Sequence, residues 1–172
     1  MPTSLYDLII PTFTKAFVTF DHILTKAEEY AKEKNLNADE VFPEAKLIED
    51  QKDLTFQVQI ASKIVQITIG RLTGVEPEFW ENNEKTIADL HARVQKTLEL
   101  IKSVKPEDVN SREDAKIDLP WAGKTHSITV KEAVLTHGQP NVFFHVVTAY
   151  SILRAKEVPV GKADYLGNFL EV

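Results

Sequence analysis

The sequence contains no cysteine, so disulfides and thiolate chemistry are excluded, and any bound metal would need His, Asp, Glu or amide ligands. It also lacks long apolar runs: none approaches the roughly eighteen residues that span a bilayer. Residues 1–13 carry no basic region ahead of a continuous apolar segment, as a secretory leader would. These absences predict a cytoplasmic protein with no membrane partner.

Clusters of positive charge are lacking as well. The formal net charge is −6 and no cluster of Lys and Arg occurs, which argues against a nucleic-acid partner because phosphate backbones are bound by basic patches. No GxSxG, HExxH, phosphate-loop or dinucleotide fingerprint is present, and those enzyme classes are excluded. With 172 residues, of which 43% are hydrophobic and 27% charged, the chain is expected to form a single globular domain over residues 1–172.

Helical periodicity is the main pattern that the sequence does contain. Apolar residues recur at helical spacing over residues 4–34, 54–72 and 84–103, which predicts three long helices. Pro11 lies inside the first of them, so that helix either begins or bends there. Residues 54–72 also alternate in places like a strand, but nineteen residues without a turn signal are too many for one.

The connections between the helices carry their own signals. Asn37 is expected to cap a short helical turn over residues 38–41. Phe79 and Trp80, in a predicted loop over residues 74–83, are expected to cover one end of the core. Residues 117–119 and 126–128 alternate around Gly123 and predict a small β-hairpin. Glycine and proline limit helix formation after residue 154, so the tail is expected to be an ordered strap across the bundle.

The segment from Thr129 to Glu157 is predicted to be the central helix. Thr129 and Glu132 have the spacing of a capping box, which marks the start of a helix. Residues 142–149 are apolar on almost every side, as in a helix buried within a bundle. Pro140 removes one backbone hydrogen bond and crowds the carbonyl of Thr136, so a kink is expected near Thr136.

Uncharged polar residues mark the candidate site. His137, Asn141 and His145 recur at steps of four and should share one face of the central helix. The second helix carries Gln57, Gln59, Ser62 and Gln66, where a solvated face would more often carry charge. Polar groups inside an apolar bundle need partners, so this set predicts either a hydrogen-bond network or a ligand site.

The polar face formed by His137, Asn141 and His145 could support two kinds of chemistry. His137 and His145 are about 12 Å apart along a helix axis, too far to share one ion, and an amide is a poor partner for zinc or nickel. A metal is therefore not expected; if one binds, Asn141 and His145 are its ligands. His145 could instead act as a general acid or base, or tie helices together as a buried neutral histidine. Of the other histidines, His22 and His126 are expected at the surface and His91 in a structural role.

Three segments carry a family resemblance: QVQIAS (57–62), PNVFFHVVTAYSILR (140–154) and VPVGKADYLG (158–167). They resemble the family called domain of unknown function 1993, which is grouped with the DinB/YfiT-like metalloenzyme superfamily. The resemblance implies an up-down-down-up four-helix bundle, often dimeric. Together with the hairpin expected from the residues, the predicted fold is an all-α bundle with a small β-hairpin before the last long helix.

The resemblance also bears on the site. Superfamily relatives, among them thiol-dependent transferases and a mycothiol-dependent isomerase, hold a divalent metal with one histidine on the second helix and an HxxxH pair on the last. Here Asn141 and His145 occupy the HxxxH positions, and the second helix offers Gln57 or Gln59, so two of the three ligands are missing.

The function favoured by these observations is binding of a small organic molecule in an internal pocket formed by Gln57 or Gln59, His137, Asn141 and His145. The alternatives are an enzyme, either a metal-dependent transferase or a metal-free isomerase with His145 as the catalytic acid/base, and a structural or regulatory homodimer without a ligand.

Overall fold

A computed structural model describes residues 3–109 and 111–170; residues 1–2 and 171–172, the ends of the predicted domain, lie outside the described part. Four long helices form a bundle: α1 (Leu5–Lys34), α3 (Leu54–Thr73), α4 (Ile87–Ser103) and α7 (Gln139–Ala155). Shorter elements are α2 (Ala38–Val41), α5 (Pro106–Val109), β1 (Lys116–Trp121), β2 (Lys124–Thr129), α6 (Val130–Ala133), the π-helical turn η1 (Val134–Gly138) and α8 (Lys162–Leu170).

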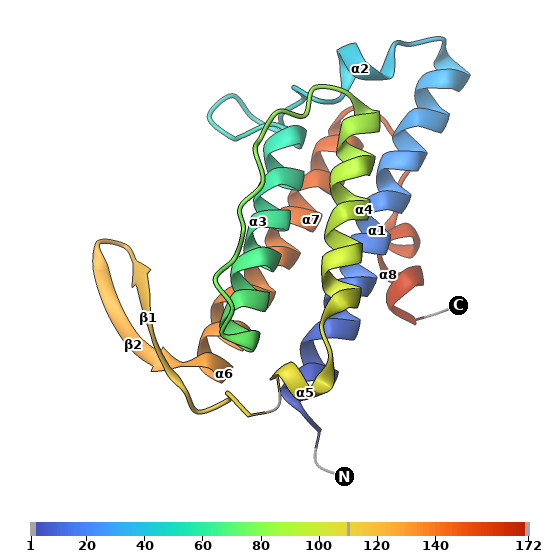
Figure 1. Ribbon diagram of the computed structural model, residues 1–172. Coiled ribbons are helices and arrows are strands. Elements are labelled where there is room, and N and C mark those ends of the chain that lie inside the picture. The colour runs from blue at the N-terminus through green and yellow to red at the C-terminus, as the bar shows by residue number, and fades with distance from the viewer. Residues whose placement is uncertain (1–2, 110, 171–172) are drawn as a thin grey trace.

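The long helices follow the up-down-down-up order that the resemblance implied. Helices α3 and α4 run in the same direction, so the chain must return along the whole bundle between them, as the extended green segment in Figure 1 does. The fold expectation, an all-α bundle with a hairpin before the last long helix, is therefore confirmed.

Side-chain oxygens and glycine set the helix boundaries. Ser4 and Thr86 begin α1 and α4 with capping boxes, and Asp53 begins α3 by accepting the N–H of Phe56. Gly74 ends α3 with φ 77°, a conformation that favours glycine. Pro11 lies inside α1, which begins at Leu5, so the alternative in which the helix starts at the proline is wrong.

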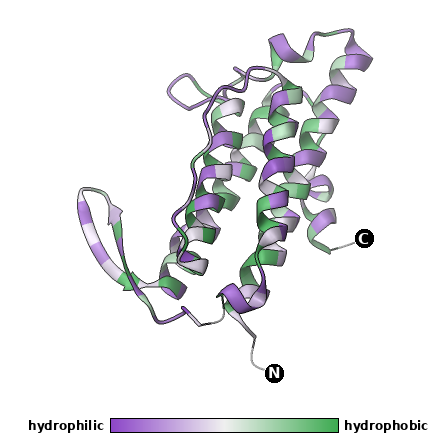
Figure 2. Cartoon of the chain, viewed as in Figure 1, coloured by the Kyte–Doolittle hydropathy of each residue, from purple (hydrophilic) through white to green (hydrophobic). Residues whose placement is uncertain are grey.

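The core fills the space between the long helices with aromatic and branched side chains. Phe13, Phe17 and Phe20 of α1 are completely buried there. Figure 2 shows hydrophobic residues along the helices and a mostly hydrophilic returning segment. Within the described residues, no helix is long and apolar enough to cross a membrane.

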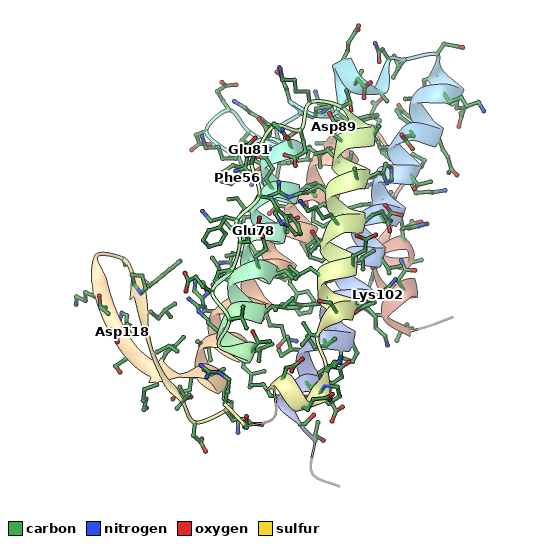
Figure 3. The ribbon with its side chains drawn as sticks, in the orientation of Figure 1. Phe56, Glu78, Glu81, Asp89, Lys102 and Asp118 are labelled. Atoms are coloured by element: carbon green, nitrogen blue, oxygen red, sulfur yellow. The ribbon has the colours of Figure 1, made fainter. Side chains whose placement is uncertain are left out.

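The returning segment, residues 74–86, corrects one expectation. Phe79 and Trp80 were predicted to cover one end of the core, but the segment lies along the side of the bundle, and Phe79 is 51% exposed. Figure 3 shows Glu78 and Glu81 on this segment beside α3. Their neighbours Phe79 and Trp80 make cation–π contacts, Phe79 with Lys63 and Trp80 with both Arg93 and Lys96.

The tail forms a strap across α1, as expected, but the strap is a nine-residue helix, α8. Its Tyr165 and Phe169 pack on the core, and His22 of α1 contacts Asp164 with Nε2 2.9 Å from the carboxylate oxygen. The surface assignment of His22 is therefore wrong in part: its side chain is 39% exposed but is held by α8.

Candidate functional site

The start of the central helix has the expected cap and an unexpected form. Thr129 and Glu132 make the predicted capping box, which begins α6. Where the sequence predicts a kink near Thr136, the chain makes the π-helical turn η1. A π turn gives room to the ring of Pro140, which has no N–H for a regular α-helical bond to Thr136. The irregularity therefore lies near Thr136, as Pro140 led us to expect.

His137, Asn141 and His145 all line one cleft of about 650 Å³. Its other walls are Pro140 and Phe144 of α7, Thr136 of η1, and Leu119, Trp121, His126 and Ile128 of the hairpin. The predicted common face of the three polar residues is thus present. It opens onto a cleft between α7 and the hairpin rather than onto a pocket inside the bundle.

The hairpin presents one face to this cleft. Its antiparallel register pairs Ile117 with Ile128 and Leu119 with His126, and residues opposite each other lie on the same face of a sheet. His126 is exposed, as expected, yet it lies on this inner face and lines the cleft. The sequence could have placed it there, because residues 126 and 128 are two apart in a strand and share a face.

Gln57 positions His145. The side-chain amide of Gln57 donates to the carbonyl of Lys52 at 3.0 Å, and its Oε1 lies 2.8 Å from Nδ1 of His145. His145 is 7% exposed, with the rings of Phe56 and Phe144 edge-on to it. Burial lowers the pKa of His145 to about 4, so the imidazole is neutral at pH 7.

His137 lies eight residues before His145, in η1, and beside Trp121. The two rings meet edge to face, with centroids 5.6 Å apart. Nδ1 of His137 is buried and has no hydrogen-bond partner among the residues described. Burial, and then the nearby positive charge of Arg71, lowers the pKa of His137. The cleft wall therefore carries two imidazoles that favour the neutral form.

Gln59 does not join the site. Its amide donates to Glu84 Oε2 at 2.8 Å on the opposite side of α3. Gln57 also contributes only indirectly, because it contacts His145 and does not line the cleft. Of the proposed ligand-binding set, the structure brings His137, Asn141 and His145 together, supports His145 with Gln57, and separates Gln59.

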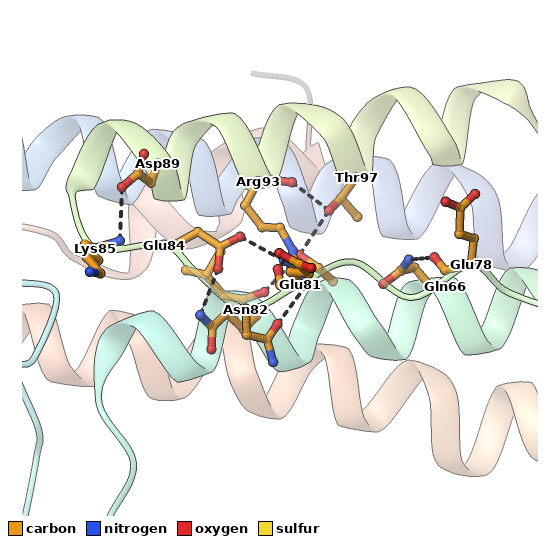
Figure 4. A network of polar contacts seen from close by, with 12 residues as sticks. Gln66, Glu78, Glu81, Asn82, Glu84, Lys85, Asp89, Arg93 and Thr97 are labelled. Carbon is orange, nitrogen blue, oxygen red and sulfur yellow. Dashed lines mark hydrogen bonds and ion pairs between the residues drawn. The ribbon is translucent and has the colours of Figure 1, made fainter.

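The sequence did not predict the polar network around Arg93 and Glu84 (Figure 4). Gln59 joins this network through its hydrogen bond to Glu84. Arg93 of α4 is 4% exposed and donates to the carbonyl of Glu81 at 2.7 Å and to Glu84 at 2.8 Å. Gln66 donates to the carbonyl of Glu78. Gln59, Gln66 and the buried Arg93 thus hold the returning segment against the bundle.

The residues present do not fit the three-ligand metal site that the resemblance implies. Nowhere in the described part of the chain do three His, Cys, Asp or Glu side chains come together as a metal site. The position on α3 is filled by Gln57, whose Oε1 is engaged with His145, and Asn141 offers only a weak amide ligand. The cleft is better suited to an organic ligand than to an ion.

Comparisons with known proteins are consistent with the four-helix bundle and identify the family of the chain. The family model described as Domain of unknown function (DUF1993) matches residues 5–166, and the chain belongs to this family. A solved structure, described as a DinB family member protein from Shewanella denitrificans, is similar to this chain at 36% identity, with a TM-score of 0.86. The match covers 95% of this chain and 92% of that one. No curated protein matches the sequence.

Proposed function

We propose that this protein binds a small organic molecule in the cleft between α7 and the hairpin. One observation carries the proposal: two imidazoles and an amide, those of His137, His145 and Asn141, line the same apolar cleft. Such groups can give a ligand hydrogen-bond partners within an apolar surface.

The shape and composition of the cleft support the same proposal. Its volume, about 650 Å³, lies within the range of small-molecule sites, which are mostly apolar with a few convergent polar groups. Phe144 and Trp121 are each 59% exposed, which is costly for large aromatic side chains unless something covers them. A ligand would cover both.

Binding can be tested by recording amide and imidazole NMR spectra during titration with a set of neutral and charged aromatic fragments. We expect shift changes at the hairpin and α7, and His137→Gln should weaken binding at least about fivefold. His22→Gln is the matched control, because His22 lies on α1 beside α8 and should leave affinity unchanged. Shift changes confined to the opposite side, near Trp80 and Lys96, would refute the proposal.

An enzymatic role for His145 is the alternative. With a pKa of about 4, His145 cannot serve as a general acid at pH 7 and is a weak general base. These properties suit a binding group better than a proton carrier. A metal-dependent transferase is tested by elemental analysis of the purified protein: we predict less than about a tenth of an equivalent of metal, given the weak donor set.

We also propose that the protein is a cytoplasmic homodimer. The exposed apolar side chains Val147 and Leu47 support the dimer, because they border a second shallow hollow beside the cleft. An apolar surface of this kind is typical of contacts between subunits.

A further inference from the structure

The geometry points to the chemical class of the ligand: an uncharged aromatic molecule that donates one hydrogen bond, from O–H or N–H, to Nε2 of His145. The inference rests on the proposed function, since it concerns the same cleft. It follows from the hydrogen bonds of Gln57, from the charges around the cleft and from the rings in its walls.

Gln57 determines which nitrogen of His145 carries the proton. The carbonyl of Lys52 can only accept, so the end of the Gln57 side chain that contacts it must be the NH₂ group. The other end, Oε1, also can only accept, and it lies 2.8 Å from Nδ1 of His145. Nδ1 must therefore carry the hydrogen.

Nε2 of His145 is then left as an acceptor. A neutral imidazole with hydrogen on Nδ1 has a lone pair on Nε2 and no second donor. Within the described residues no group hydrogen-bonds to Nε2, and the ring lines the cleft. The low pKa of His145 supports the neutral form over the working range of pH. A ligand that meets Nε2 must bring its own hydrogen.

The charge of the ligand follows from the walls. None of the ten residues lining the cleft is Asp, Glu, Lys or Arg. A ligand with a net charge would lose hydration without gaining an ion pair from the walls, which is costly. Arg71 acts electrostatically on His137 but is not part of the lining. These conditions favour an uncharged molecule.

The aromatic character follows from the same lining. Trp121 from the hairpin and Phe144 from α7 both border the cleft, and both rings are largely exposed. Flat apolar molecules pack well on such rings, with stacked or edge-on geometry. A phenol-like compound combines the flat ring with the required donor.

Three probes of equal ring size test the inference on the intact protein: para-cresol, para-methylanisole and para-toluate. The first donates a hydrogen bond, the second has the hydroxyl hydrogen replaced by methyl, and the third is an anion. We expect para-cresol to bind in the cleft, and both other probes to bind about tenfold or more weakly. In His145→Phe, which keeps an apolar ring but no acceptor, cresol and methylanisole should bind equally.

The tautomer can be measured without any ligand. In a ¹⁵N-labelled sample at pH 7, the two ring nitrogens of His145 should show Nδ1 protonated and Nε2 unprotonated. This measurement does not depend on whether His145→Phe folds. A proton on Nε2 would overturn the inference even if ligands bind.

The outcomes separate the inference from the proposed function. Equal affinity of cresol and methylanisole in the cleft would overturn the inference and leave the binding function intact. Tighter binding of toluate than of cresol would also overturn the inference, because it would indicate an anionic ligand attracted by Arg71. If none of the three probes perturbs the cleft, the inference and the proposed function both fail.

Discussion

At the residue scale, burial of His145 makes the stability of the fold depend on pH. Its pKa is about 4 in the folded protein and about 6.5 in an unfolded chain. Between these values the unfolded state binds a proton that the folded state does not, so lowering the pH favours unfolding. We predict that the free energy of unfolding falls by on the order of 2 kcal/mol between pH 6.5 and 4. Urea titrations at several pH values measure this.

The variant that tests this prediction is His145→Gln. Glutamine at position 145 cannot titrate, so the fall in stability should shrink clearly. His137, whose pKa is lowered in the same direction, accounts for part of the remaining slope. An identical slope in His145→Gln and in the unsubstituted protein would contradict the account.

The sequence correctly predicted which polar residues of the central helix share a face. It could not determine which glutamine of α3 contacts His145. Gln57 and Gln59 are two residues apart on a helix and so point to nearly opposite sides. Only the packing of α3 decides that Gln57 meets His145 while Gln59 meets Glu84. The common face of His137, Asn141 and His145 was predictable. Residues spaced by four still line the same cleft, although η1 is π-helical.

At the element scale, the π turn η1 depends on a close approach between Gly138 and α3. A Cβ on Gly138 would lie 2.6 Å from Oγ1 of Thr68. We predict that Gly138→Ala lowers the free energy of unfolding by about 1–3 kcal/mol, as overpacking usually does. Urea unfolding is the measurement. Combining it with Thr68→Ala should recover part of the loss, because the clashing atom is then removed.

Gly167→Ala is the control for that substitution. Gly167 lies in α8 and a Cβ there would meet nothing within 4 Å. Alanine should therefore be neutral or stabilising by up to about 1 kcal/mol, as expected for glycine replaced in a helix. Equal destabilisation by the two alanines would show that the contact with Thr68 is not the cause.

The returning segment, residues 74–86, gives a second prediction at this scale. Arg93→Leu would leave the largely buried carboxylate of Glu84 without its cation, and removing one partner of a buried ion pair costs about 3 kcal/mol or more. Amide hydrogen exchange of residues 78–84 should accelerate. Lys96→Leu is the comparison: Lys96 is exposed and also contacts Trp80, so only a small change of about 1 kcal/mol or less is expected. Unchanged exchange in Arg93→Leu would refute the role of the network.

The helices and the hairpin were predictable because their signals are local: periodicity, caps and turn glycines. The path of the returning segment was not, because it is set by contacts between residues far apart in the chain, such as Gln59 with Glu84. Phe79 and Trp80 were expected to cover one end of the core because of their apolar character, whereas they contact cations of α3 and α4 along the side of the bundle. The π-helical form of η1 was not predictable from the sequence, because it depends on how η1 packs on α3.

At the scale of the whole molecule, the order of the helices came from the resemblance to the family and not from periodicity. The same resemblance implies a dimer, which light scattering at micromolar concentration can test. We expect the mass of a dimer, and Val147→Glu should shift the protein toward monomer, because a buried charge opposes association. Leu36→Glu, at a site of the same 44% exposure, should not. A monomeric mass for the unsubstituted protein would defeat the dimer proposal.

The central claim is that the cleft between α7 and the hairpin receives a ligand at His145, and a crystal structure of the protein with para-cresol tests it most directly. We expect the cresol ring between Trp121 and Phe144, with the phenol oxygen within hydrogen-bond distance of Nε2 of His145. Cresol found only elsewhere on the protein, or a cleft holding nothing but water at saturating cresol, would contradict it.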